Sequence, residues 1–305
     1  MRRKKLNIAV IGIGYLGKYH LEKFLSNKNC ITKWIVDTNK QNTLGYKNIK
    51  ITDNYKEIIG DIDAVSIVTP TNCHFEIAKY FLSNKKHVLI EKPMTQTVLE
   101  AKKLLKIATS NKIVLQAGHL ERFNPVMKKL SKDIKDPLFI EVHRLAKFNP
   151  RSTDVNVIFD LMIHDIDIVT SLVKRKIKHI SAFGKKIITN STDIANVRIE
   201  FSGGAVANLT ASRISQKNER KVRIFEKDRY YSVDFMNSNI KIYNKNSKNK
   251  EGLFNYKEFN YEKTDSLKEE INNFVLSCIG QSKPLVDGEQ GMNAVKTATL
   301  ISESL

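Results

Sequence analysis

The first 120 residues alternate short, nearly continuous apolar runs with stretches in which apolar positions recur every three or four residues. Residues 7–11 and 63–69 are mostly apolar, as strands buried on both faces of a parallel sheet are. Residues 15–26 have helical spacing, with apolar positions such as Leu16 and Tyr19. Further strands are predicted at 32–36, 49–52, 87–90 and 112–117, and helices at 73–83 and 98–109. This alternation predicts an α/β domain with a doubly wound, parallel Rossmann sheet.

After residue 120 the pattern changes to strand-like stretches, and helical stretches become fewer. Ser202-Gly203-Gly204 separates two of the stretches and is typical of a hairpin turn. Strands are predicted at 139–147, 177–187, 193–202, 205–215, 220–231 and 232–243, helices at 157–173, 266–278 and 289–305, and polar loops at 151–156 and 245–252. We expect an α+β domain with a large, mainly antiparallel open sheet. The predicted domains are 1–120 and 121–305, with a last helix that can pack back on the first domain.

The chain has 305 residues and a formal net charge of +19. Its lysines are spread over the whole chain and are not gathered in one stripe, so no nucleic-acid partner is expected. A basic surface would still attract a diphosphate-bearing substrate or an anionic lipid. No apolar run approaches the ~20 residues that span a bilayer, so stable membrane insertion is not expected.

The three cysteines, Cys30, Cys73 and Cys278, are scattered and form no Cys-x-x-Cys pair. Neither a disulfide framework nor a zinc site is therefore expected. The basic start of the chain runs into a strand and a glycine loop and lacks the core of a signal peptide. A cytoplasmic location is the resulting expectation.

The loop Gly12-Ile13-Gly14-Tyr15-Leu16-Gly17 lies between the first strand and the first helix. In this context Gly12 permits a tight turn, Gly14 lets the backbone approach a pyrophosphate, and Gly17 lets the helix pack close to the strand. The free N–H groups of the helix start then face the phosphates. The loop predicts a dinucleotide site, and a purely structural glycine turn is the alternative.

Asp37 ends the second predicted strand, twenty residues after Gly17. A carboxylate there accepts hydrogen bonds from the hydroxyl groups of the adenine ribose and repels a 2′-phosphate. NAD is therefore the expected cofactor. NADP is not excluded, because Lys40 lies close by.

Two further segments follow strands of the predicted sheet, at the edge where ligands of open α/β sheets bind. Thr69-Pro70 ends one strand, with Asn72 and His74 just beyond it. These residues are candidate cofactor contacts, and the alternative for Thr69 and Asn72 is capping of the next helix.

Glu91-Lys92-Pro93 follows the strand at 87–90, on the same edge. Pro93 restricts Lys92 to extended geometry and so aims its side chain in a defined direction. A cation at this position can hold a substrate oxygen and favour its alkoxide while hydride leaves. Glu91 and Lys92 are therefore candidate cofactor contacts. Lys92 is also a candidate for catalysis and substrate binding, and an ordinary surface lysine is the alternative.

Asp160 and His164 are four residues apart on a predicted helix and share one face. A carboxylate beside an imidazole suits general acid–base work, because the acid orients the ring and tunes its pKa. A metal site would need more ligands, from His119, His143, Asp165 or Asp167, and hydride transfer from an alcohol requires no metal. No metal is therefore predicted, and Asp165 and Asp167 are expected to cap the helix or face solvent.

These motifs, in this order and spacing, resemble the glucose–fructose oxidoreductase, inositol dehydrogenase and MocA family (Gfo/Idh/MocA). The resemblance rests on the glycine loop, Thr69-Pro70-x-Asn72-x-His74, Glu91-Lys92-Pro93 and Asp160-x-x-x-His164. It implies a Rossmann domain, a second domain whose sheet builds homodimers or homotetramers, and a tightly held NAD or NADP. It also implies that Lys92 and His164 share proton and charge handling while Asp160 orients the substrate. Asn156-Val157-Ile158-Phe159 departs from the family, where a glycine-rich segment often precedes this helix.

The stretch from Gly118 to Pro125, with Glu121 and Arg122 at its centre, resembles a narrower subgroup described as UDP-N-acetylglucosamine 3-dehydrogenases, which act in lipid A biosynthesis. The resemblance implies oxidation of a nucleotide sugar at carbon 3. The alternative for Arg122 is an ion pair with Glu121 at the start of a helix, or a brace at the interface between the domains. The other competing readings are an inositol or free-sugar dehydrogenase and a non-catalytic NAD-binding regulatory protein. Candidate contacts to the substrate's polar groups are Arg122, Arg151, Asn156 and Arg213.

Overall fold

The computed structural model describes residues 5–150, 155–245 and 254–305. Its contacts divide the chain into two compact units. Unit 1 comprises Met1–Leu120 and Asp265–Val295, and unit 2 comprises Glu121–Thr264 and Lys296–Leu305. Of the predicted second domain, 121–305, the contacts place α6 (Ser266–Cys278) and the first half of the last helix, α7 (Gly288–Glu303), in unit 1.

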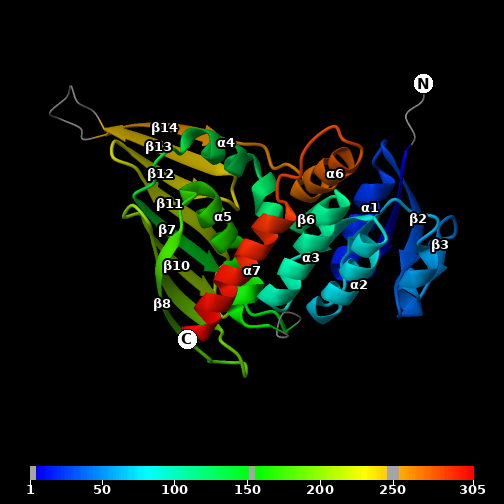
Figure 1. Cartoon of the computed structure of the whole chain (residues 1–305). Helices are drawn as coiled ribbons and strands as arrows, with labels where there is room; N and C mark the ends of the chain where they lie inside the picture. The colour runs from blue at the N-terminus through cyan, green and yellow to red at the C-terminus, as the bar shows by residue number, and fades with distance from the viewer. Residues whose placement is uncertain (1–4, 151–154, 246–253) are drawn as a thin grey trace. The chain divides into compact units, whose positions relative to one another are not determined.

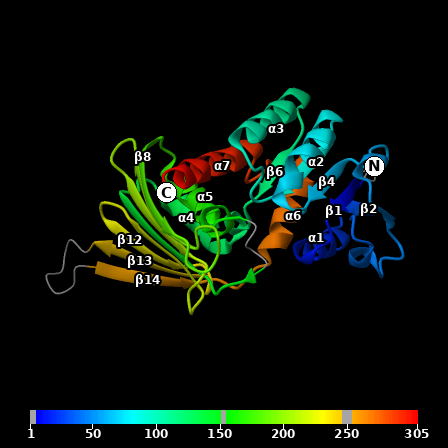
Figure 2. The ribbon, with the colours of Figure 1, turned by 90° about the horizontal axis from the view of Figure 1, so that it is seen from below.

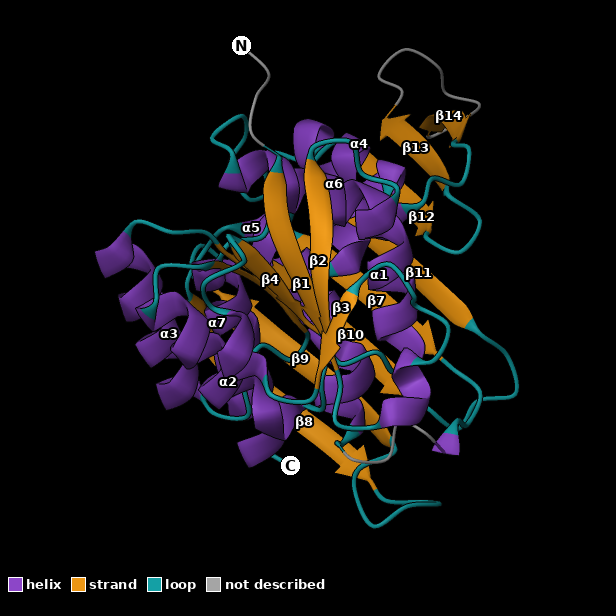
Figure 3. Cartoon of the chain, turned by 90° about the vertical axis from the view of Figure 1, so that its right-hand side faces the viewer, coloured by secondary structure: helices purple, strands orange, loops and turns teal. Residues whose placement is uncertain are grey.

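Unit 1 is built on a six-stranded parallel sheet with the order β3-β2-β1-β4-β5-β6. Helices cover both faces, with α2 and α3 on one side and α1 and α6 on the other (Figure 3). The order reverses between β1 and β4, which is where a doubly wound sheet binds its ligand. The strands are β1 (Leu6–Ile11), β2 (Cys30–Val36), β3 (Lys50–Thr52), β4 (Ala64–Ile67), β5 (His87–Glu91) and β6 (Leu115–Gly118), and the helices are α1 (Tyr15–Leu25), α2 (Thr71–Ser83) and α3 (Val98–Asn111).

The core of unit 1 follows from the apolar runs of its strands. Ile8 and Val10 of β1 and Leu89 of β5 are completely buried. Ile271 and Phe274 of α6 lie in the same apolar cluster, although some 180 residues separate α6 from β5 along the chain. The predicted Rossmann sheet is thus confirmed, with α6 as an additional covering helix.

Unit 2 contains an eight-stranded sheet with the order β14-β13-β12-β11-β7-β10-β9-β8. Its neighbouring strands are antiparallel except for β10 and β7. Figures 1 and 2 show α4 and α5 against one face of this sheet. The elements are α4 (Pro125–Asp133), β7 (Phe139–Leu145), α5 (Ile163–Val173), β8 (Ile177–Lys185), β9 (Ile194–Phe201), β10 (Val206–Ser212), β11 (Glu219–Phe225), β12 (Arg229–Asp234), β13 (Asn239–Lys245) and β14 (Phe254–Asn260).

Strict alternation gives the large sheet two different faces. Ile140 and Val142 of β7 are buried, whereas Phe139 on the opposite face is half-exposed. On that opposite face aromatic rings form a ladder with centroid separations between 4.6 and 5.9 Å. The ladder comprises Phe139, Phe225, Tyr230, Tyr243 and Tyr256. The predicted α+β class and its mainly antiparallel sheet are confirmed.

Several elements of unit 2 differ from the predicted ones. Residues 219–245 form three strands where two longer ones were expected, and β14 and α4 were not predicted. The predicted helix 157–173 begins with a π-helical turn, η5 (Ile158–Met162). The hairpin is as predicted, because Gly203 and Gly204 both have positive φ between β9 and β10. Most of the predicted loops, at 151–154 and 246–252, lie outside the described residues.

Candidate functional site

The glycine loop has the close contacts that a dinucleotide turn requires. Gly12 has φ +88°, and a Cβ on it would lie 2.6 Å from the carbonyl oxygen of Val68. A Cβ on Gly17 would lie 1.9 Å from the carbonyl oxygen of Gly12, so α1 can pack this closely only with glycine there. A Cβ on Gly14 would meet nothing within 4 Å. The backbone beside Gly14 is therefore open to a phosphate, while the other two glycines are fixed by packing.

Asp37 connects the glycine loop to the end of β2. Its Oδ2 accepts the backbone N–H of Ile13 at 2.6 Å and the side-chain amide of Asn42 at 3.2 Å. Its Oδ1 accepts the N–H of Asn39 at 2.7 Å. The carboxylate also lines a cavity of about 450 Å³, together with Lys40. This position fits the ribose hydroxyls of NAD, while Lys40 places a cation in the same cavity.

The segment after β4 is fixed by His74. His74 is 1% exposed, and its ring nitrogens lie 2.8 Å from the carbonyl oxygen of Thr69 and 2.9 Å from that of Pro93. Burial lowers the pKa of His74, and the two carbonyl contacts oppose part of this effect. His74 thus braces the end of β4 against the turn after β5. We propose that it shapes the cofactor site without facing the cofactor.

Thr69 and Asn72 do not cap α2, whose N-cap is Pro70 and has no side-chain hydrogen bond. Asn72 is exposed at the start of the helix. The Oγ1 atom of Thr69 is buried and has no hydrogen-bond partner among the described residues. The capping alternative is thus not what the structure shows, and a cofactor contact remains our proposal for both residues.

Lys92 lies half-buried immediately after β5 and precedes a cis peptide bond to Pro93. Glu91 holds the backbone of Lys92 in place, because Oε2 of Glu91 accepts the backbone N–H of Lys92 at 3.1 Å. Oε1 of Glu91 lies 3.1 Å from Nε2 of the fully buried His20, whose Nδ1 lies 3.0 Å from the hydroxyl of Ser66. Burial disfavours the charged form of Glu91, but these hydrogen bonds outweigh it and lower its pKa. A chain of three buried side chains therefore fixes the backbone at Lys92.

Asp160 and His164 lie in unit 2, on the helix formed by η5 and α5, and both are half-buried. Asp160 falls within the π-helical turn, and His164 within the first turn of α5. Single π-turns occur frequently at functional sites, because they shift side chains away from the regular helical positions. The sequence spacing predicted the helix but not this turn.

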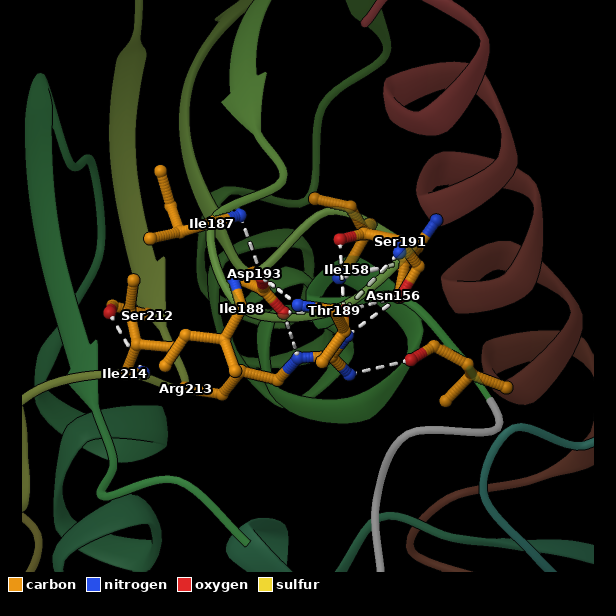
Figure 4. A network of polar contacts seen from close by, with 11 residues as sticks. Asn156, Ile158, Ile187, Ile188, Thr189, Ser191, Asp193, Ser212, Arg213 and Ile214 are labelled. Atoms are coloured by element: carbon orange, nitrogen blue, oxygen red, sulfur yellow. Dashed lines mark hydrogen bonds and ion pairs between the residues drawn. The ribbon is translucent and has the colours of Figure 1, made fainter. Parts of the chain in front are cut away.

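A buried polar network orders the chain that leads into η5 (Figure 4). Arg213, 2% exposed, donates to Asp193 at 2.9 Å, to the carbonyl of Val155 at 2.7 Å and to the hydroxyls of Thr189 and Ser191. Burial disfavours the charge of Asp193, but the hydroxyl of Thr189 and the N–H groups of residues 187–189 outweigh it and lower the pKa of Asp193. These contacts make Arg213 part of the interior of unit 2.

Asn156 begins the helix that carries Asp160. Its Oδ1 accepts the N–H groups of Ile158 and Phe159, and its Nδ2 donates to the hydroxyl of Ser302 at 3.0 Å. Arg151, the remaining candidate in this segment, lies outside the described residues. Asn156 thus acts as a helix cap. The predicted contact between Asn156 and the substrate stays a prediction.

The stretch from Gly118 to Pro125, in which Arg122 is a candidate substrate contact, forms ion pairs. Arg122 Nη1 lies 3.2 Å from Asp167 Oδ1, with both side chains largely buried. Glu121 accepts from Arg144 and from Arg220, at 3.1 Å in each case. Asp165 is buried against Arg144, so the expectation that Asp165 and Asp167 cap the helix or face solvent was wrong. Arg122 therefore pairs with Asp167 inside unit 2, and not with Glu121 as one alternative had it.

Two family models cover most of this architecture. Residues 6–119 match the oxidoreductase family with an NAD-binding Rossmann fold, GFO_IDH_MocA, and residues 136–230 match the GFO/IDH/MocA C-terminal domain. The chain belongs to the Gfo/Idh/MocA family of oxidoreductases. The resemblance inferred from the motifs is thereby confirmed, and so is the assignment as an NAD-binding enzyme.

Individual relatives of this Gfo/Idh/MocA chain include several dehydrogenases. It is 34% identical over 300 residues to the UDP-N-acetylglucosamine 3-dehydrogenase of Acidithiobacillus ferrooxidans, an alignment that covers 96% of this chain and 95% of the relative. A solved structure of that enzyme covers 99% of this chain and 98% of its own, with a TM-score of 0.92 and 32% identity. The myo-inositol 2-dehydrogenase of Thermotoga maritima is 24% identical, over 98% of this chain and 96% of its own.

The network around α5 contains a residue that the sequence analysis missed. Arg144, at 3% exposure, lies at the same strand parity as the buried Ile140 and Val142 of β7. A charged residue at a buried parity needs an ionic partner, and this signal would have identified Arg144 in the sequence. His20 similarly lies on the buried face of α1.

Two features are absent from the described part of the chain. No three His, Cys, Asp or Glu side chains there are grouped in a way that would hold a metal ion. No helix among the same residues has the length and apolar character needed to cross a membrane.

Proposed function

We propose that this oxidoreductase oxidises UDP-N-acetylglucosamine at carbon 3 with NAD. The observation that carries the proposal is the full-length likeness to an enzyme named for that reaction, at 34% identity over 96% of the chain. The relatives named for inositol oxidation are more distant, at 23% to 26% identity. The Asp37 carboxylate at the end of β2 supports NAD as the oxidant.

Bound NAD would accept the hydride from carbon 3 of the sugar. We propose that the imidazole of His164 takes the proton of the 3-hydroxyl group, because a neutral imidazole is a suitable base near neutral pH. Asp160, four residues earlier in the same helix, would orient the sugar. The hydride thus carries away both electrons of the carbon–hydrogen bond. The electron pair of the oxygen–hydrogen bond stays on oxygen and forms the second carbon–oxygen bond of the ketone.

Lys92 would stabilise the negative charge that develops on the substrate oxygen. Its backbone is fixed by Glu91 and His20, which limits the positions that the ammonium group can reach. A fixed cation of this kind contributes about 10²–10³-fold in rate where charge develops in a protected site.

Substrate binding needs a separate proposal, because Arg122 and Arg213 are occupied by Asp167 and Asp193. We propose that these two arginines and Asn156 act on the substrate indirectly, by ordering the elements around η5 and α5. The net charge of +19 would favour a UDP-sugar over an uncharged sugar at the stage of encounter.

The substrate is tested with purified protein, NAD and a panel containing UDP-N-acetylglucosamine, UDP-glucose, N-acetylglucosamine and myo-inositol. We expect kcat/KM for UDP-N-acetylglucosamine to exceed that for each other compound by at least ~100-fold. Reduction of the product with borodeuteride should place deuterium at carbon 3. Preferential turnover of myo-inositol or a free sugar would replace the proposal by the inositol or free-sugar alternative. Tight NAD binding without turnover on any compound would favour a regulatory protein.

A further inference from the structure

Four ionic side chains from four elements form a network in unit 2, which is buried except for Arg220. Arg144 of β7 donates from Nε to Oδ1 and Oδ2 of Asp165, at 2.8 and 3.0 Å. Its Nη1 donates to Oε1 of Glu121 at 3.1 Å, and Glu121 also accepts from Arg220 at 3.1 Å. Arg144 and Asp165 have side chains only 4% and 2% exposed. Asp165 directly follows His164 in the chain.

A second ion pair holds the same helix from another element. Arg122, just before α4, lies 3.2 Å from Asp167 of α5. Asp165 and Asp167 are two residues apart and therefore point to different sides of the helix. Two arginines on two elements thus fix both the rotation of α5 and its position along the helix axis.

We propose that Arg144 is a positioning residue, which acts through Asp165 to set the direction of the His164 imidazole and of Asp160. The inference rests on the proposed role of His164 as the base that serves the sugar hydroxyl. It extends that role to the sheet, since β7 then holds the base-bearing helix by an ionic contact in which the Nε–H of Arg144 is shared between both carboxylate oxygens of Asp165. A guanidinium group suits this task because it is planar and binds a carboxylate at two atoms.

The interior position of the pair makes the contact rigid. Burial raises the pKa of Asp165 to about 6, although the Arg144 guanidinium opposes this rise. Removing only one member would leave an uncompensated group inside the protein, which typically costs ~3–5 kcal/mol and can unfold the chain. A test of positioning must therefore remove both charges together.

The double variant Arg144→Met/Asp165→Asn removes the contact without leaving either charge buried alone. Glu121 keeps its ion pair with Arg220 in this variant. The matched control is Arg220→Met, which removes a half-exposed arginine from the same Glu121 and leaves the ion pair between Arg144 and Asp165 in place. Circular dichroism and thermal melting establish that each variant is folded.

We expect the double variant to retain its fold while kcat for UDP-N-acetylglucosamine falls about 10- to 100-fold, because small misplacement of a reacting group costs this much. KM for NAD should stay within about twofold, since the proposed cofactor contacts belong to unit 1. Arg220→Met should leave kcat within about twofold. A folded double variant with wild-type kcat would overturn the inference, because Arg144 would then be structural only.

A second measurement does not depend on turnover. The ¹H–¹⁵N signals of the His164 ring, assigned by their loss in His164→Asn, should shift in the double variant and stay in place in Arg220→Met. Unchanged ring signals in the double variant would overturn the inference even if the substrate proved to be different. Absence of wild-type turnover with shifted ring signals would contradict the proposed substrate while supporting the positioning role.

Discussion

Replacing Glu270 with methionine is expected to make the protein more stable. Glu270 of α6 is completely buried, and neither of its carboxyl oxygens has a hydrogen-bond partner among the described residues. Burial, and then the nearby carboxylate of Glu91, raise the pKa of Glu270 well above its usual value. Its neighbours Ile271 and Phe274 belong to the apolar core, so a methionine side chain suits the site.

The expected gain follows from the cost of burying a polar group without a partner. That cost is ~1–3 kcal/mol in protein interiors, and a volume-conserving replacement loses less than ~1.5 kcal/mol through imperfect packing. Because the pKa of Glu270 is raised in the folded chain, the folded chain keeps this proton to a higher pH than the unfolded chain does. The stability that depends on the protonated carboxyl is therefore fully present below the unfolded pKa and is lost as pH rises through the folded pKa. The advantage of Glu270→Met should therefore grow as pH rises.

The assay is urea denaturation of both proteins at several pH values between about 5 and 9. We expect Glu270→Met to be more stable at the upper end of this range by about 1–3 kcal/mol, with a flatter dependence on pH. The control is Glu22→Met, which removes an exposed glutamate of α1 that pairs with its neighbour Lys23, and it should change stability by less than about 1 kcal/mol. Destabilisation by Glu270→Met, or an unchanged pH slope, would refute this reasoning.

Three further predictions concern the proposed reaction and assembly. Lys92→Met and His164→Asn should each lower kcat by at least ~100-fold in steady-state kinetics. His164→Asn should keep its affinity for NADH, measured by fluorescence titration. Asp37→Ala should weaken NAD binding by roughly 10-fold and narrow the preference for NAD over NADP, and equal losses for both cofactors would contradict the role of this carboxylate. We also propose that copies of the chain associate through the aromatic ladder of the large sheet; Tyr243→Glu places a charge within this ladder and should lower the mass measured by light scattering. An unchanged mass would show that this face is not the interface.

The Rossmann sheet could be predicted because its strands are apolar on both faces and stand out along the chain. Ala64–Ile67 is buried at every position, and so are Val88–Glu91 of β5. The strand β14 was missed because it carries polar and aromatic residues in nearly equal number at the edge of the large sheet. The assignment of α6 to unit 1 depends on contacts over more than 150 residues, which local spacing does not reveal.

The motifs of the candidate site could be predicted from the sequence, but the side chains that hold those motifs in place could not. The glycine loop and Asp37 follow from residue type and spacing, because the turn admits few alternatives. The partner of Arg122 could not be deduced, since an arginine next to a glutamate fits both substrate binding and an ion pair. The same holds for Arg213, whose guanidinium contacts lie in segments 20 to 58 residues away. Such roles depend on which strands become neighbours, and this is decided by the tertiary fold.

Transfer of the carbon-3 hydrogen is the most direct test of the proposed reaction. UDP-N-acetylglucosamine carrying deuterium at carbon 3 is incubated with the protein and NAD, and the reduced cofactor is analysed by mass spectrometry. We predict that the reduced nicotinamide carries the deuterium and that turnover is slower than with unlabelled substrate. Reduced cofactor without deuterium would place the oxidation at another carbon, and no reduced cofactor would contradict the proposed substrate.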